Sequence, residues 1–317
     1  MYDFRSALGT AIVTSLIVLT TPLALAQPKP TAVRVAATPI TNYTPLIVAR
    51  DKGWFTDEGL AVTWTMVAQG ALAVEAVYGG SAEFGCSAIL EPMVARGNRL
   101  DVMLAVPNTR ILATQPDNSG LVVRDKDAIR SAKDLAGKKI AAGLINSVNY
   151  LHLHEWMQKH GADPKSAQFM EIPFPQMPDA LFQNRVDAVW AVEPFLTIMT
   201  RSGNARTIAY PYQENIPNMD IALLIAKESW LKANADTARR FRRAMDRATK
   251  HLIESPKAER DDWVSKWTGV KPELVAAMNL PQFTTEFNVP SLKANLDLAV
   301  RRGAVKAFDV ETMIWKP

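Results

Sequence analysis

The hydrophobic positions of residues 33–87 fall into short apolar runs that are separated by amphipathic segments. Apolar runs rich in β-branched residues predict strands, and apolar residues at helical spacing predict helices. The predicted order is a strand at 33–37, a helix at 45–52, a strand at 60–67, a helix at 71–78 and a strand at 82–87. Strands and helices that alternate across short connections form a parallel, doubly wound sheet.

The same order returns between residues 139 and 192. Strands are predicted at 139–142, 167–172 and 186–192, and helices at 148–160 and 178–184. Two βαβαβ halves therefore follow one another in the chain. The expected fold class is α/β, with two lobes that each contain a mainly parallel, doubly wound sheet.

An internal repeat supports this division. A helix-like stretch, an apolar strand and an acid-proline step follow one another twice, ending once at Glu91-Pro92 and again at Glu193-Pro194. The two strands also carry matching acidic residues, Glu83 and Asp187. Such self-similarity indicates a repeated supersecondary unit, so we expect two similar lobes that face each other.

Two further apolar runs, Leu121–Arg124 and Ile221–Ala226, stand where the chain must pass between the lobes. We interpret them as two crossing strands that form a hinge. Beyond Ala226 the pattern is largely helical, and we expect this tail to cover the first lobe. The expected domains are 27–122 plus 223–317 for lobe I and 123–222 for lobe II.

The first 26 residues have the layout of a secretory signal peptide. Arg5 precedes an apolar run, which is followed by Pro22 and by the small-residue site Ala24-Leu-Ala26. We expect export, cleavage after Ala26 and a periplasmic location. An uncleaved membrane anchor is the alternative.

Composition narrows the class of protein. The chain of 317 residues has 36 basic and 32 acidic residues, a net charge of +4 that is too diffuse to indicate a nucleic-acid partner. Its single cysteine, Cys86, excludes an internal disulfide. An exported protein of this size without disulfides fits a soluble, monomeric protein of a bacterial periplasm.

Ligands of open parallel sheets bind beyond the carboxyl ends of the strands. Six predicted loops lie there, three from each lobe: 38–43, 68–70, 87–89, 143–149, 174–177 and 190–193. They are polar and aromatic but nearly free of cations, and three of them open helices near Thr44, Gly70 and Ser147. Free N–H groups at these helix starts favour a compact anionic group, and the aromatic residues can flank an organic portion.

Several of these residues have structural interpretations as well. Trp190 fits either the core or a ligand platform, and Glu193 either accepts a ligand amine or binds loop N–H groups. Arg110 can reach an anion or face solvent, and the sequence does not separate the two. Simple turn or cap roles are open to four polar residues: Asn42, Gln69, Ser147 and Asn149.

Catalytic and metal motifs find little support in the sequence. His152, His154 and His160 share a predicted helix, but their spacings do not include the four-residue step of helical metal pairs. No nucleotide-binding glycine loop and no nucleophile motif occurs in the sequence. We therefore expect neither an enzyme, a metal site nor a cofactor.

Four stretches of the chain carry a resemblance to a known family: 45–60, which contains Asp51-Lys-Gly-Trp-Phe-Thr-Asp-Glu-Gly59; Ser81–Gly85; 134–140; and 186–195. They resemble periplasmic substrate-binding proteins of ABC importers in the nitrate, sulfonate and taurine group, which includes NMT1/THI5-like thiamine-precursor binding proteins. The resemblance implies a two-lobe periplasmic-binding-protein fold of type II with a two-strand hinge. It also implies capture of a solute in the cleft and delivery to an ABC permease of the inner membrane.

The resemblance also assigns cleft contacts in this chain. They are Thr38, Asn42, Tyr43, Gln69, Gly70, Ser87, Asn146, Ser147, Asn149, Trp190 and Glu193. The resemblance does not fix the solute, but the cation-poor, donor-rich loops predict a small organic anion, a sulfonate or a carboxylate. Alternatives are binding or synthesis of a thiamine pyrimidine precursor, or a solute-binding sensor subunit. The synthases of this fold use a cysteine-rich iron motif, which a chain with Cys86 alone does not match.

Overall fold

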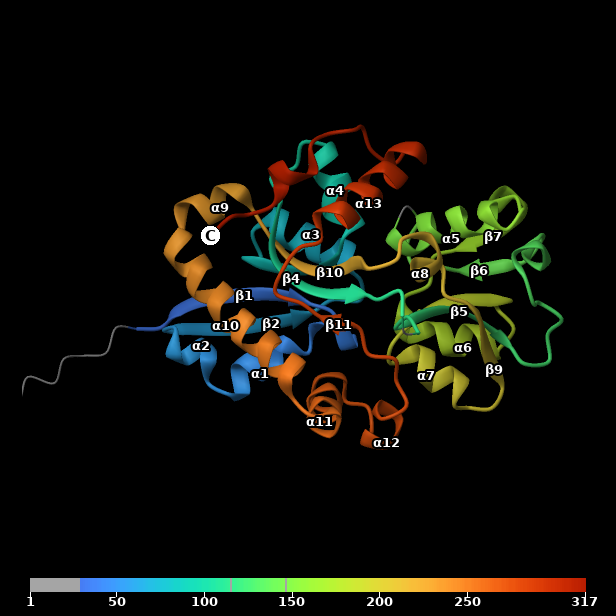
Figure 1. Ribbon diagram of the computed structural model, residues 1–317, viewed down its shortest axis with the longest axis horizontal. Helices are drawn as coiled ribbons and strands as arrows, with labels where there is room; N and C mark the ends of the chain where they lie inside the picture. The colour runs from blue at the N-terminus through green and yellow to red at the C-terminus, as the bar shows by residue number, and fades with distance from the viewer. Residues whose placement is uncertain (1–28, 115, 146) are drawn as a thin grey trace, which may run out of the picture.

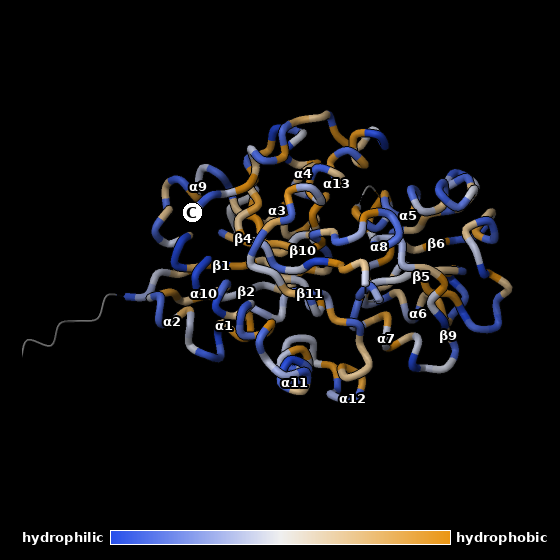
Figure 2. The backbone as a smooth tube through the Cα atoms, viewed as in Figure 1, coloured by the Kyte–Doolittle hydropathy of each residue, from blue (hydrophilic) through white to orange (hydrophobic). Residues whose placement is uncertain are grey.

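The computed structural model describes residues 29–317 except 115 and 146, and it consists of two lobes built on separate sheets (Figure 1). The expected signal peptide lies outside the described residues. Apolar segments occupy the strands inside each lobe, and polar segments lie mainly in the outer loops and helix ends (Figure 2). Within the described part of the chain, no helix is long and apolar enough to cross a membrane.

The first lobe contains a six-stranded sheet in the order β11-β4-β10-β3-β1-β2. β1 pairs in parallel with both β2 and β3, while β10 runs antiparallel between β3 and β4. The strands are β1 Thr31–Ala37, β2 Leu60–Met66, β3 Phe84–Ala88, β4 Met103–Ile111, β10 Met219–Ala226 and β11 Gln282–Phe283.

The second lobe contains a five-stranded sheet in the order β7-β6-β8-β5-β9. β6 pairs in parallel with β7 and β8, and β5 runs antiparallel between β8 and β9. Its strands are β5 Ser119–Arg124, β6 Lys139–Ala141, β7 Gln168–Met170, β8 Ala188–Val192 and β9 Ala205–Ala209. This order reproduces β2-β1-β3-β10-β4 of the first lobe, so the predicted two-lobe α/β fold is confirmed, and the repeated strands β3 and β8 occupy equivalent places.

Helices cover both sheets. In lobe I they are α1 Pro45–Asp51, α2 Trp54–Asp57, α3 Gly70–Gly79 and α4 Leu90–Gly97. In lobe II they are α5 Val148–Lys159, α6 Met177–Phe182, α7 Phe195–Thr200 and α8 Pro211–Asn215. The tail adds α9 Glu228–Ala233, α10 Ala235–Glu254, α11 Lys257–Thr268, α12 Pro272–Val275 and α13 Val289–Arg301. Short 3-10 turns occur at Thr41–Tyr43, Ala132–Leu135, Pro164–Ser166, Phe174–Gln176 and Val310–Met313.

The tail covers the first lobe and also reaches the second. Phe241 of α10 stacks on Phe84 of β3 with ring centroids 4.0 Å apart, so α10 closes the first core. On the other side of the molecule, Asn295 of α13 contacts the ring nitrogen Nε2 of His152 in α5 at 3.0 Å. Arg302, just beyond α13, forms an ion pair with Glu155 of the same helix. The helical tail therefore contacts both lobes and helps to hold them together.

The positions of the crossing segments differ from the expectation. Leu121–Arg124 lies in β5, which pairs only with strands of the second sheet, and Ile221–Ala226 lies in β10, which pairs only with the first. The chain instead changes lobe at 112–118 and at 216–218, between these strands and their predecessors. Apolar composition marks both runs as buried strands but does not say in which sheet a strand is buried.

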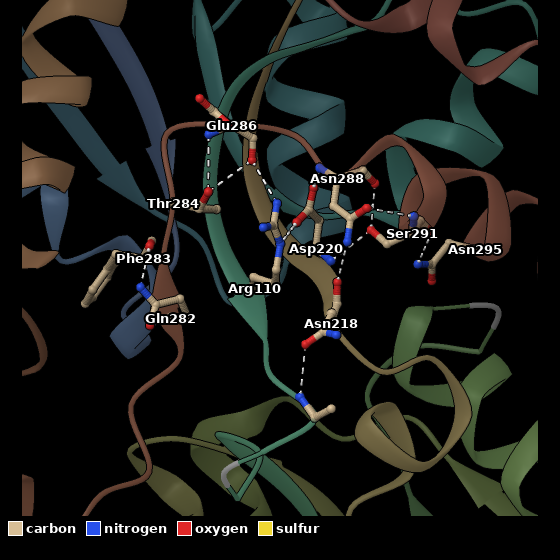
Figure 3. Close-up of polar contacts among 11 residues, drawn as sticks. Arg110, Asn218, Asp220, Gln282, Phe283, Thr284, Glu286, Asn288, Ser291 and Asn295 are labelled. Carbon is tan, nitrogen blue, oxygen red and sulfur yellow. Dashed lines mark hydrogen bonds and ion pairs between the residues drawn. The ribbon is translucent and has the colours of Figure 1, made fainter.

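Arg110 and Asp220 stand at the lobe I end of these two segments (Figure 3). They are register partners in the β4–β10 pair, and Arg110 Nε lies 2.7 Å from Asp220 Oδ1. The second carboxylate oxygen of Asp220 accepts the backbone N–H of Asn288, at 2.5 Å, from the segment that opens α13. Nearby, Asn218 Oδ1 accepts the backbone N–H of Ala113 at 3.2 Å and so links the two crossing segments directly.

Candidate ligand-binding cleft

A cavity of about 350 Å³ lies between the lobes. Each of the six loops expected at the carboxyl ends of the strands supplies at least one residue to its lining, represented by Thr38, Gln69, Ala88, Gly143, Phe174 and Val192. The lobes meet here because equivalent sheets present equivalent ends to one another. A volume of this size suits a small organic molecule.

Seven of the residues expected to contact ligand line this cavity. They are Thr38, Asn42, Tyr43, Gln69, Gly70, Ser147 and Asn149. Asn146 lies outside the described residues. The remaining three, Ser87, Trp190 and Glu193, are buried and lie outside the lining. For all of them, a contact with ligand stays a prediction.

The side chain of Asn42 links three segments of the chain beside the cleft. Its Nδ2 donates to Thr109 Oγ1 at 2.8 Å, and its Oδ1 accepts from Nδ2 of Asn118, at 3.0 Å, in the first crossing segment. Its backbone carbonyl accepts from Asn108 Nδ2 at 2.7 Å. Because both atoms of the amide are already engaged, Asn42 shapes the cavity and holds the crossing segment against lobe I.

Two lining residues mark the starts of helices that open at the cleft. Ser147 caps α5, and its Oγ accepts the backbone N–H of Tyr150 at 3.4 Å, so the cap interpretation holds for this residue. Gln69 precedes α3 without a side-chain cap. Gly70, the first residue of α3, approaches β3 so closely that an added Cβ would lie 3.2 Å from Ala88 N. A side chain at this position would therefore crowd the backbone of β3.

Trp190 belongs to the core of lobe II. Its side chain is fully buried, and its ring packs against the ring of Tyr212 with centroids 4.6 Å apart. Tyr212 lines the cavity, whereas Trp190 does not. The position of Trp190 near a strand end is compatible with a ligand platform, but the aromatic side chain that lines the cavity here is Tyr212 of α8, which follows β9.

Glu193 binds main-chain groups at the end of β8. Its carboxylate accepts the backbone N–H of Thr197 at 3.0 Å and that of Asn279, from the tail, at 3.1 Å. Burial raises the pKa of Glu193 to about 7, and these hydrogen bonds oppose the rise. Of its two interpretations, the bonding of loop N–H groups is the one that the geometry supports.

Glu91 is the residue of the cleft that sequence reasoning missed. It lies in the first turn of α4 and lines the cavity, and its Oε2 has no hydrogen-bond partner among the described residues. Burial raises its pKa, and N–H groups of its own backbone and of Val148 oppose the rise. The internal repeat could have identified Glu91 as a site residue, because Glu91-Pro92 is the counterpart of Glu193-Pro194 at the end of the equivalent strand.

Opposite Glu91, Asn149 of α5 presents a free donor. Its Oδ1 accepts the hydroxyl of Tyr212 at 2.8 Å, whereas its Nδ2 is buried without a partner in the described structure. Thr38 Oγ1, on the lobe I side, is likewise buried and unpartnered among these residues. Buried polar atoms are normally satisfied, so such atoms around a cavity indicate where a ligand or water would bind.

The cavity lining of the described chain contains acidic side chains and no basic ones. No lysine or arginine of the described chain lines the cavity, whereas Glu75 and Glu91 do. Arg110 is not among the lining residues, because its guanidinium binds Asp220 and the carbonyl oxygen of Glu286. The predicted scarcity of cations therefore holds, but the carboxylates were not expected.

The three histidines of α5 point to separate partners. Beside the contact of His152 with Asn295, His154 packs against Tyr150 with ring centroids 4.1 Å apart, and the His160 ring contacts the Trp156 carbonyl, 2.8 Å away. Across the described residues, no group of three or more His, Cys, Asp or Glu side chains is arranged to hold a metal ion.

Comparison of the sequence with models of known families identifies the family of this chain. The NMT1/THI5-like family model matches residues 40–259, which is more than two thirds of the chain. The chain belongs to the NMT1/THI5-like family. The matched span covers both crossing segments and almost all residues that line the cavity.

Two relatives show how broad this family is. The chain is 22% identical over 265 residues to the 4-amino-5-hydroxymethyl-2-methylpyrimidine phosphate synthase of Aspergillus parasiticus, a match that covers 77% of this chain and 72% of the relative. It is 25% identical over 283 residues to YtlA of Bacillus subtilis, which is named as a putative binding protein, with 80% and 79% covered. The chain is thus similar both to proteins named as synthases and to proteins named for binding.

Solved structures establish the fold. The alkanesulfonate-binding protein SsuA of Xanthomonas axonopodis superimposes with a TM-score of 0.77 at 18% identity, covering 92% of this chain and all of its own. The periplasmic nitrate-binding protein NrtA of Synechocystis gives a TM-score of 0.75 at 15% identity, with 90% and 85% covered. Both are solute-binding proteins, and the type II periplasmic-binding-protein fold predicted for this chain is confirmed.

Proposed function

We propose that this protein is the periplasmic solute-binding component of an ABC importer and delivers a small organic molecule to a membrane permease. The observation that carries the proposal is the cavity between the lobes, which draws its lining from both sheets. A ligand held there by both lobes stabilises the arrangement in which the lobes are closed. A permease can recognise this closed form, because its outer surface differs from that of the open form.

The chain can close only by bending at the two crossing segments. The described residues of the two crossing segments, 112–118 and 216–218, form no strand, and each strand of the described chain belongs to one sheet alone. Each lobe can therefore move as a rigid body. Arg110 and Asp220 clamp β4 to β10 at one end of these segments, which confines bending to the residues beyond the ion pair. Closure excludes water, and hydrogen bonds from the two lobes to the ligand become stronger together.

Catalysis is not part of the proposal. Cys86 is buried in β3, and burial raises the pKa of its thiol far above the usual value, so it is not poised as a nucleophile or a thiolate ligand. The relationship to a pyrimidine phosphate synthase keeps a pyrimidine precursor among the candidate solutes.

The structure offers two opposing signals on the charge of the solute. The N termini of α3 and α5 at the cleft support the organic anion expected from the sequence, whether sulfonate or carboxylate. Glu75 and Glu91 oppose an anion, because no cation of the described lining neutralises them. Binding should therefore be measured by calorimetry with anionic ligands and with uncharged or cationic ones.

The direct test is to identify the bound molecule. Native mass spectrometry of protein purified from periplasm should reveal a co-purified solute that is released unchanged by denaturation. Titration calorimetry with taurine, alkanesulfonates, benzoate, nitrate and 4-amino-5-hydroxymethyl-2-methylpyrimidine should show one class that binds in the micromolar range or tighter, about −8 kcal/mol. Turnover of the bound molecule would instead support the synthase alternative, and a ligand-dependent complex with a signalling protein would support a sensor subunit.

A further inference from the structure

The carboxyl group of Glu91 lines the cavity and has a buried oxygen atom, Oε2, without a hydrogen-bond partner in the described structure. It lies within the cleft rather than on the surface, and no ion pair or side-chain hydrogen bond compensates it in the described chain. Its counterpart in the repeat, Glu193, is saturated by hydrogen bonds from Thr197 and Asn279. A buried carboxyl oxygen without a hydrogen-bond partner costs stability, so the Oε2 atom of Glu91 at the cavity lining indicates a role toward what enters the cavity.

The groups around Glu91 do not relieve this cost. Tyr43 and Tyr212 also line the cavity and are both buried, and burial raises the pKa of each hydroxyl well above its usual value. They therefore remain neutral. Glu75, an exposed residue of α3, contributes a second carboxyl group to the lining. A ligand that brings a negative charge would meet no cation among the described lining residues, and an ionised carboxyl group there would repel it.

The free donor and the free acceptor come from opposite lobes. Glu91 belongs to α4 of lobe I and offers an acceptor, while Asn149 Nδ2 belongs to α5 of lobe II and offers a donor. The backbone N–H of Val148, the neighbour of Asn149, already acts on the Glu91 carboxyl group, so the two elements approach each other here. A ligand that donates N–H groups to Glu91 and accepts from Asn149 would join the lobes at this point.

We propose that Glu91 is a ligand-binding residue that selects solutes with an N–H-bearing nitrogen group, such as an amine, an amidine or an amino-substituted ring, and rejects organic anions. The proposal rests on the proposed function as a solute-binding protein. The apolar part of such a ligand would lie against the aliphatic lining, which includes Ile40, Val74 and Leu100. The nitrogen group would supply the hydrogen bonds that Glu91 lacks in the described structure.

The experiment compares two probes that share one aromatic ring and differ in charge, benzamidine and benzoate. Calorimetry should show that the wild-type protein binds benzamidine at least tenfold more tightly than benzoate. In Glu91→Gln the ratio of the two affinities should fall at least tenfold, because the charge is removed while the shape is kept. The variant Glu254→Gln, which removes an exposed carboxylate of α10 outside the cavity lining, should leave the ratio unchanged.

The outcomes separate this proposal from the proposed function. An unchanged ratio in Glu91→Gln, with the variant folded and still able to bind a probe, overturns the role of Glu91 while solute binding stands. A co-purified solute that lacks any N–H group overturns it as well. If neither a co-purified solute nor a probe binds either form, solute binding itself fails, and the role of Glu91 fails with it. Thermal melting verifies that Glu91→Gln is folded.

Discussion

Arg110 and Asp220 form an ion pair with 2.7 Å between Nε and Oδ1, at the point where the chain is about to leave lobe I and has just returned to it. The side chain of Asp220 is only 4% exposed and that of Arg110 is 23% exposed, so solvent screens the pair little. Burial raises the pKa of Asp220, and the Arg110 guanidinium opposes the rise. The pair thus fixes the base of the hinge and leaves Arg110 unavailable to a ligand.

Replacing Arg110 by alanine should therefore destabilise the protein. The change leaves a buried carboxylate without its cation, which costs about 3 kcal/mol. Urea unfolding of Arg110→Ala at neutral pH should show this loss, and Arg110→Lys should lose less. Arg239→Ala, which removes an exposed guanidinium of α10, serves as the control and should change the free energy of unfolding by less than about 0.5 kcal/mol. Equal stability of Arg110→Ala and wild type would contradict a structural role of the pair.

Ionisation of Asp117, a buried residue of the first crossing segment, should make the free energy of unfolding depend on pH. Its Oδ1 accepts the backbone N–H of Ser119 at 3.0 Å, and burial raises its pKa to about 7. An acid whose pKa is higher in the folded state holds its proton more tightly there. Its contribution is fully present below about pH 4, falls as the pH rises toward 7 and amounts to about 4 kcal/mol in total.

In Asp117→Asn this dependence should become shallower, because the amide keeps the acceptor oxygen and cannot ionise. Urea unfolding at several values between pH 4 and pH 8 measures the slope. Some dependence should remain, since burial also raises the pKa of Glu193 to about 7. The exposed Asp262 provides the control, and Asp262→Asn should keep the slope of the wild type. An unaltered slope in Asp117→Asn would mean that Asp117 does not titrate in this range.

Trp190 should influence stability more than affinity. Its ring is buried against Tyr212, so Trp190→Phe leaves the cavity lining intact and should cost about 1–2 kcal/mol of folding free energy through lost packing. The affinity for the co-purified solute should change less than threefold. Tyr212→Phe, which removes the hydrogen bond to Asn149, should weaken binding more. The reverse order of the two effects would place the Trp190 indole in contact with the ligand.

Lobe closure can be measured on the same proteins. Small-angle scattering should give a smaller radius of gyration with the solute than without it, as the two crossing segments bend. The contacts of α13 with α5, through His152 and Glu155, span the lobes and have to adjust during this motion. An identical radius in both states would mean that binding does not require closure.

Export should remove the first 26 residues. N-terminal sequencing of the periplasmic protein should begin at Gln27, because Ala24-Leu-Ala26 has the small side chains that a signal peptidase accepts. A protein that keeps Met1 and sediments with membranes would show that the segment is an anchor. Size-exclusion chromatography of the processed protein shows whether it is a monomer.

The two-lobe fold and the order of elements within its two βαβαβ halves follow from the hydrophobic pattern of the chain. Strands and helices differ in hydrophobic period, and the repeated acid-proline steps assign β3 and β8 to equivalent positions from sequence alone. The pattern also locates the six loops that supply the cavity lining, since the carboxyl ends of parallel strands gather at one edge of a sheet. These features depend on residues that are near one another in the chain.

The role of each side chain, by contrast, depends on contacts between distant parts of the chain. Asn42 binds Thr109 and Asn118, which are far away in sequence, and Trp190 packs against Tyr212 of a helix that follows a different strand. The two halves of the acid-proline repeat also diverge, because Glu193 meets a segment of the tail whereas Glu91 faces the cleft. Local pattern encodes the period of an element, but burial and hydrogen bonding depend on the partners that folding brings from elsewhere in the chain.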